Sequence, residues 1–148
     1  MQIWFSRIDP KTHRMVVERP PHPRVDVVLE TRSLLVHDFA HWAVETALCT
    51  DAGFYGHLAA GVSLDALREP LPDEAVQKAL MDIERQVAML QGAFRKERAG
   101  QMTGADTLRR LDGAWRKTKQ GEALVVTWPE PAPAVIAMTA RVGSPVAT

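Results

Sequence analysis

The sequence predicts an α+β domain, in which a small antiparallel sheet packs with three main helices on one side. Two observations lead to this fold class. The first thirty residues contain extended segments rich in β-branched and aromatic side chains, whereas residues 33–118 contain three stretches with the apolar spacing of helices. The 148 residues are 46% hydrophobic and 24% charged, which is typical of an ordinary globular protein with one core.

The sheet is expected to combine N-terminal strands with one C-terminal strand. Segments 2–8 and 12–19 flank the turn-forming group Asp9-Pro10-Lys11 and predict a hairpin. Residues 24–31 alternate between apolar and polar positions, which predicts a third strand with one buried face. The segment ALVVTWP at 123–129 predicts the last strand, returning to the N-terminal sheet.

The helices are expected over three ranges. Ser33 is the predicted cap of a first helix that runs to about Thr50, with glycines 53 and 56 closing it. Short helical turns are expected between residues 53 and 72. A long helix follows Pro72, and a shorter one covers about 104–118.

The long helix carries an apolar seam with alternating steps of four and three residues, formed by Val76, Leu80, Ile83, Val87, Leu90 and Phe94. This spacing favours packing in the core, but it also matches a coiled-coil register. A homo-oligomer formed through the helix at 76–94 therefore stays open as an alternative. One domain over residues 1–128 is expected, followed by a flexible tail over 129–148, which is rich in proline and small residues.

Charge and composition exclude several classes of partner. The formal net charge is zero, so nucleic acid is an unexpected partner, although residues 95–119 carry a basic excess that would suit a phosphate-bearing one. No apolar run approaches the roughly 20 residues needed to cross a bilayer, and the N-terminal sequence lacks the features of a signal peptide. The single cysteine, Cys49, cannot form an internal disulfide, so a cytoplasmic protein is expected.

The segment LLVHDFAHWAVE, residues 34–45, carries the chemistry. On a helical wheel His37, Asp38, His41 and Glu45 form a narrow stripe opposite a broad apolar arc. The stripe lacks the lysine, arginine, glutamine and serine usual on solvated faces, which favours partial burial. A metal site, a hydrogen-bonded polar network and a plain solvent-facing surface are the three interpretations.

A metal site is the interpretation with the most specific geometry. Side chains one helical turn apart can close on one ion, so His37 and His41 are predicted ligands. His57 is the leading candidate for a further ligand, and Glu45 is a weaker one that can instead orient His41. Other weak candidates are Asp51 and Cys49. Zinc is the expected ion, with an open position for water, and Asp38 is the candidate catalytic base.

The stretch ETRSLLVHDFAHWAVE resembles a motif of small, uncharacterised bacterial proteins that carry His-Asp-x-x-His after N-terminal strands. The zinc-binding coenzyme Q biosynthesis family also carries His-Asp-x-x-His. Its further glutamate falls where this chain has Gly53, so only His37, Asp38 and His41 match. The first resemblance brings no activity with it, and the second implies zinc at the two histidines.

The function predicted from the sequence is zinc binding, with hydrolysis of an unknown small-molecule or peptide substrate as the candidate reaction. The alternative is a non-catalytic interaction module that associates through the seam of the long helix. Among the remaining histidines, His13 and His22 are interpreted as surface residues.

Overall fold

An antiparallel sheet forms one layer of the computed structural model, which describes residues 1–129 and 138–141. Its strands are β1 (Gln2–Arg7), β2 (Thr12–Glu18), β3 (Val25–Glu30), β4 (Glu122–Thr127) and β5 (Met138–Arg141). The strand order is β3-β2-β1-β4-β5, and every neighbouring pair is antiparallel. The predicted hairpin and the return of the last predicted strand to β1 are both confirmed.

The fifth strand differs from the expectation for the C-terminal segment. β5 lies inside the range predicted as a flexible tail, yet it pairs with β4, with Ala123 opposite Ala140. Its sequence, MTAR, has only four residues and is too short to show a clear apolar period. The rest of the predicted tail, 130–137 and 142–148, lies outside the described residues.

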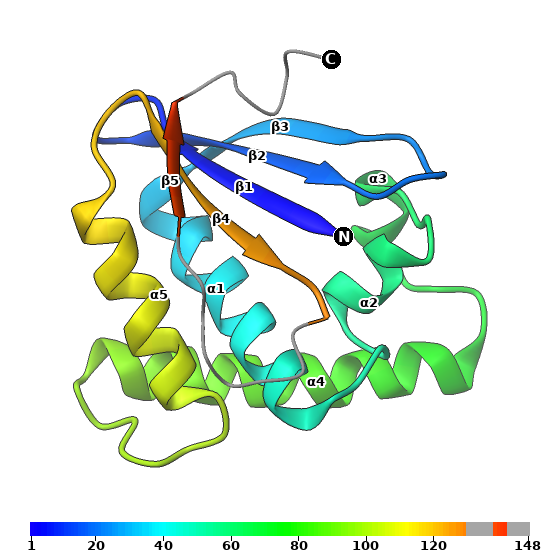
Figure 1. Cartoon of the computed structure of the whole chain (residues 1–148). Coiled ribbons are helices and arrows are strands. Elements are labelled where there is room, and N and C mark those ends of the chain that lie inside the picture. The colour runs from blue at the N-terminus through cyan, green and yellow to red at the C-terminus, as the bar shows by residue number, and fades with distance from the viewer. Residues whose placement is uncertain (130–137, 142–148) are drawn as a thin grey trace.

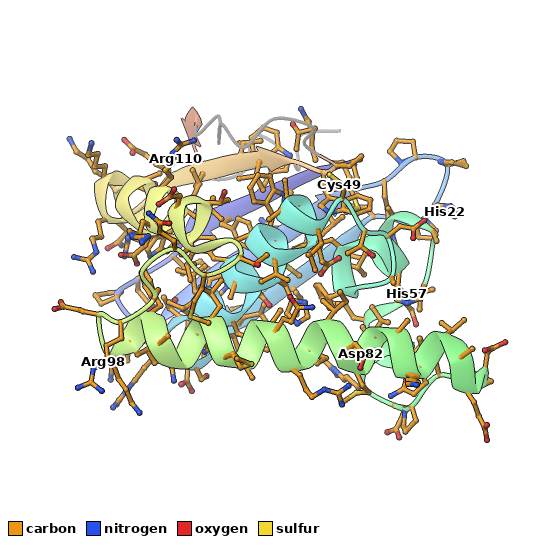
Figure 2. All side chains as sticks on the ribbon, turned by 90° about the horizontal axis from the view of Figure 1, so that it is seen from below. His22, Cys49, His57, Asp82, Arg98 and Arg110 are labelled. Atoms are coloured by element: carbon orange, nitrogen blue, oxygen red, sulfur yellow. The ribbon has the colours of Figure 1, made fainter. Side chains whose placement is uncertain are left out.

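Helices form the other layer and all lie on one side of the sheet (Figure 1). They are α1 (Thr31–Leu48), α2 (Phe54–Ala59), α3 (Leu64–Leu67), α4 (Glu74–Arg95) and α5 (Ala105–Lys117). The three long helices and the short helical turns match the predicted order, so the α+β class is confirmed. In Figure 2 the long helix α4 runs along one side of the molecule, next to α1, which contacts α4 as well as strands β2 and β3.

Both ends of α1 differ from the prediction. The helix begins at Thr31, directly after the last residue of β3, so Ser33 lies inside the first turn, where its hydroxyl bonds the Glu30 carboxylate. At the other end Cys49 adopts a left-handed conformation with φ 51°, and its N–H bonds the Thr46 carbonyl. The strand runs into the helix without a loop, and therefore without a separate cap residue.

The apolar seam of α4 is used inside the domain. Its central residues Leu80, Ile83, Val87 and Leu90 are buried, and α4 packs mainly against α1. The helix starts where Asp73 accepts a hydrogen bond from the Val76 amide, as its sequence predicts. These four seam residues pack inside the domain, whereas Val76, at the start of the seam, is 39% exposed.

The core lies between the sheet and the helices, and α1 contributes to it on more than one face. Phe39 and Trp42 of α1 are buried together with Phe5 of β1. His13 is also fully buried, with its ring near Phe5 and Trp115, so its interpretation as a surface residue is wrong. It lies on the face of β2 that packs on the helices, and this position in the strand buries the side chain although it is polar. No helix among the described residues has both the length and the apolar character to span a membrane.

Candidate metal centre

The polar stripe of α1 is enclosed. Asp38, His41 and Glu45 are 8%, 1% and 1% exposed. They are buried because α4 and α2 cover the stripe, while the apolar arc of α1 packs on the remaining core. The solvent-facing interpretation therefore does not hold for these three residues, and their polar atoms need partners inside the protein.

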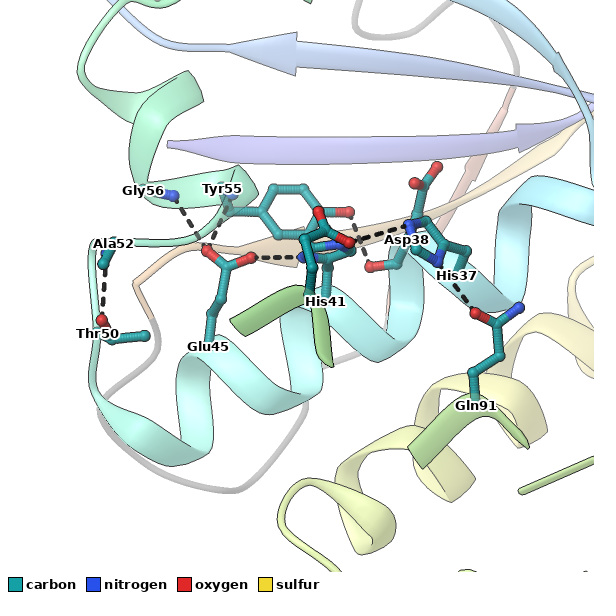
Figure 3. Close-up of polar contacts among 10 residues, drawn as sticks. His37, Asp38, His41, Glu45, Thr50, Ala52, Tyr55, Gly56 and Gln91 are labelled. Carbon is teal, nitrogen blue, oxygen red and sulfur yellow. Dashed lines mark hydrogen bonds and ion pairs between the residues drawn. The ribbon is translucent and has the colours of Figure 1, made fainter. Parts of the chain in front are cut away.

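A carboxylate from α4 completes a group with the two histidines. Glu84 Oε1 lies 3.0 Å from Nε2 of His41, and its Oε2 lies 4.0 Å from Nε2 of His37. The two imidazole rings stand edge to face with centroids 4.8 Å apart. One ligand atom from each of the three residues lies within 4.8 Å of the others. Figure 3 shows the two rings side by side on α1.

In both rings Nδ1, the nitrogen on the side away from Glu84, contacts an oxygen atom. Nδ1 of His37 lies 3.0 Å from Oε1 of Gln91, and Nδ1 of His41 lies 3.0 Å from Oε2 of Glu45 (Figure 3). A carboxylate only accepts, so Nδ1 of His41 carries a proton and donates it to Glu45. The amide oxygen of Gln91 places the proton of His37 on Nδ1 in the same way. Each ring therefore turns its Nε2 towards Glu84.

Glu45 is fixed by more than the imidazole. Its Oε1 accepts hydrogen bonds from the backbone amides of Tyr55 and Gly56 in the first turn of α2, at 3.0 and 3.2 Å. The chain can come this close only because Gly53 has no side chain, since a Cβ there would lie 2.3 Å from the Glu45 carboxyl carbon. The geometry gives Glu45 the orienting role that was the alternative to direct ligation.

The charged form of His41 and the carboxylates of Glu45 and Glu84 stabilise each other. Burial alone would lower the pKa of His41, but the flanking carboxylates of Glu45 and Glu84 raise it to about 9. For Glu84, burial acts to raise the pKa, and the contact with His41 outweighs it, so the pKa lies below its usual value. Nε2 of His41 is buried and has no partner with hydrogen-bond geometry, although Glu84 lies at ion-pair distance.

Asp38 and His57 are not part of the group. The Asp38 carboxylate points towards the strands, whereas both imidazoles lie towards α4 (Figure 3), and burial raises its pKa to about 7 against the opposing effect of His41. His57 lies on α2, and its Nε2 is buried without a partner among the described residues. The structure thus supplies Glu84, and not His57, next to the two histidines.

Sequence reasoning missed Glu84 and Gln91. Each directly follows a buried seam residue of α4, Ile83 and Leu90, and they stand two helical turns apart on one face. Polar residues bordering an apolar seam were a usable signal. The missing information was the packing of α4 on α1, which pairs this border with the histidine stripe.

The three residues form a group that could hold a metal ion, and their donor atoms are of kinds that zinc binds. Zinc ligands lie about 2.0–2.1 Å from the metal, so neighbouring donors of a tetrahedral site stand roughly 3.3 Å apart. Glu84 lies 3.0 and 4.0 Å from the two rings, and all three ligand atoms lie within 4.8 Å of one another, so the side chains would have to move closer together to bind one ion. The side chains of His37 and Glu84 are 36% and 32% exposed, which leaves one side of the group open to water.

Comparison of the chain with protein-family models, with curated proteins and with solved structures gave no match in any of the three. The resemblance at the His-Asp-x-x-His motif therefore rests on the motif residues alone. The group formed by His37, His41 and Glu84 is the feature of the structure that bears on function.

Proposed function

We propose that this chain is a zinc-binding protein whose protein ligands are Nε2 of His37, Nε2 of His41 and a Glu84 oxygen. One observation supports it above all others. Both rings have Nδ1 held by an oxygen acceptor while Nε2 turns towards a common carboxylate. Metal-bound histidines use this arrangement, in which an outer carboxylate or carbonyl fixes the proton on the nitrogen that does not bind the metal.

The reaction class proposed for the site is hydrolysis of a small-molecule or peptide substrate. Two histidines and one carboxylate leave a fourth position of zinc for water, and a bound zinc lowers the pKa of that water to about 7. The half-exposed side of His37 and Glu84 supports access of a substrate to that position. A cytoplasmic location is part of the proposal, supported by the single cysteine.

Metal analysis tests the proposal. The full chain, purified without chelator and dialysed against zinc, is expected to retain about one zinc per chain. The double variant His37→Ala/His41→Ala is expected to retain almost none. His22→Ala is the matched control, because His22 is an exposed histidine outside the group, and it should bind zinc like the wild type.

A second variant separates the metal site from a mere polar network. Glu84→Gln keeps the shape of the side chain and its place on α4, but it removes the anionic ligand. We expect a clear loss of zinc affinity with an unchanged circular dichroism spectrum. Wild type and the histidine variant holding equally little zinc would reject the metal site and leave the network interpretation.

A further inference from the structure

A small cavity that opens to the protein surface lies beside Asp38. Its volume is about 180 Å³. For comparison, an engineered apolar cavity of about 150 Å³ is large enough for benzene. The cavity is lined by apolar side chains from β2, β3 and helices α1 to α3, namely Met15, Leu29, Leu34, Phe54, Leu64 and Leu67.

The Asp38 carboxylate is the unexplained group in this wall. Asp38 is 8% exposed and lines the cavity. Within the described part of the chain, its carboxylate has no hydrogen-bond or ion-pair partner, and only the charge of His41 acts on it. Buried carboxylates normally have a partner, because burial without one is strongly unfavourable. A partner supplied by a ligand would explain why an acid occupies this position.

Arg68 does not supply that partner. It also lines the cavity, but it is 67% exposed and pairs with the exposed Asp65. The arginine therefore lies at the mouth of the cavity, while Asp38 lies deeper in its wall.

We propose that this cavity binds a small primary amine whose apolar body is about the size of one aromatic ring. The apolar walls accept the body, and the ammonium group donates to the Asp38 carboxylate. The two groups are complementary, because an ionised carboxylate only accepts hydrogen bonds and an ammonium only donates them. A phosphate or a carboxylic acid would place a like charge beside Asp38.

A larger cavity, of about 760 Å³, is less informative. It lies between the end of α4 and α5, and its arginines 109 and 116 already pair with Asp106 and Asp112. These two arginines thus have partners within the chain, in contrast to Asp38.

The amine site goes beyond the proposed zinc function and does not depend on it. None of the three proposed zinc ligands lines the cavity. Phe54 connects the two places, because it lines the cavity and its ring centroid lies 5.6 Å from that of His41. The test is therefore carried out on zinc-free protein, so that its result is independent of metal binding.

Two probes of equal size test the proposal. Benzylamine and benzyl alcohol are titrated separately into the zinc-free full chain and followed by calorimetry and backbone-amide NMR. We expect saturable binding of benzylamine, with the largest shifts at Phe54 and in α3. Benzylamine should bind about 10-fold or more tightly than benzyl alcohol, since a hydrogen bond between charged groups is stronger than a neutral one.

Variants assign the contact. Asp38→Asn should lower the affinity for benzylamine about 10-fold or more and leave that for benzyl alcohol unchanged. Leu67→Trp should block both probes by filling the cavity. Asp65→Asn is the matched control, an exposed carboxylate near the mouth, and should change neither affinity by more than about 2-fold.

Three results would overturn the proposal. These are no saturable binding of benzylamine, equal affinity for the two probes, and benzylamine affinity unchanged in Asp38→Asn. If Asp38→Asn does not fold, two other measurements decide: the affinities of the two probes for the wild type, and their binding to Leu67→Trp. Binding to Leu67→Trp as tight as to the wild type overturns the site.

Discussion

At the scale of single residues, the proton on Nδ1 of His41 depends on Glu45. In Glu45→Gln the amide oxygen can still accept from the amides of Tyr55 and Gly56, but the NH₂ group then faces His41. The imidazole has to accept at Nδ1 and carry its proton on Nε2, where zinc would bind. We expect zinc affinity to fall about 10–100-fold.

Zinc competition against a chromophoric chelator measures this change, and Glu74→Gln, at an exposed position of α4, is the control. Unchanged affinity in Glu45→Gln would show that Glu45 does not orient the ring. Nitrogen-15 shifts of the imidazole, recorded on the zinc-loaded proteins, report which ring nitrogen keeps its proton and separate this effect from loss of structure.

The buried Asp38 carboxylate is expected to reduce stability in the absence of a ligand. Asp38→Asn keeps the shape and removes the charge from a site without a partner, so the free energy of unfolding should rise by about 1–3 kcal/mol. Urea denaturation at pH 7.5 measures it. A destabilised variant would mean that the charge has a stabilising contact within the chain.

His13 predicts a defined dependence of stability on pH. Burial lowers its pKa to about 4, against an ordinary value of 6.5. Above pH 6.5 the ring is neutral in both states; below it the unfolded chain takes up the proton first, so the free energy of unfolding falls until about pH 4. The loss attributable to His13 is up to about 3 kcal/mol.

Urea denaturation of wild type and His13→Gln between pH 7.5 and pH 4 checks this expectation. The glutamine can still bond Thr31, which lies 3.1 Å from Nδ1 of His13, but it does not titrate in this range. The difference in stability between the two proteins should change with pH as described. A constant difference would place a charged imidazole in the folded state.

At the scale of elements, α4 shows how differently neighbouring positions of one helix contribute. Leu90 is 1% exposed and faces the core, whereas Met89 is 65% exposed. Leu90→Ala should lower the free energy of unfolding by about 2–5 kcal/mol, and Met89→Ala should change it by less than about 0.5 kcal/mol. Chemical denaturation of both variants tests the placement of the seam. Similar losses at both positions would indicate a second surface packed on α4.

Elements with strong periodicity were predictable from the sequence. The alternation in β3 and the seam of α4 predicted the type and position of these elements, because burial of one face places apolar residues at regular intervals in the sequence. The start of α1 was not predictable, since a strand that runs straight into a helix has no loop and no cap. β5 was missed because its pairing with β4 depends on a neighbour, and its own sequence has little periodicity.

The candidate site was predictable only in the part that lies on one helix. His37 and His41 share a stripe, and that stripe follows from the helical repeat. Glu84 comes from α4, and its approach depends on how two helices pack, which no local pattern contains. His57 was predicted as a ligand because the glycine-rich segment 53–61 could fold it back towards the stripe. The structure instead places Glu84, an acid far along the chain, beside the two histidines.

At the scale of the whole molecule, a zinc ion at this site would join α1 to α4. Binding to the folded state alone stabilises it by about 2.7 kcal/mol when the free zinc concentration is 100 times the Kd. We therefore expect the thermal midpoint to rise with zinc in the wild type. The midpoint of His37→Ala/His41→Ala should not move, and magnesium should have no effect on either protein. Equal zinc shifts in both proteins would place the ion elsewhere.

The position of β1 in the sheet has a consequence for how the protein is made. β1 is synthesised before the other four strands of this sheet and ends up in the middle, between β2 and β4. Its hairpin partner follows at once, but β4 is translated only after all the helices. During synthesis one edge of β1 therefore stays unpaired until β4 has been translated. The pairing of β1 with β4 forms late, because it joins distant parts of the sequence.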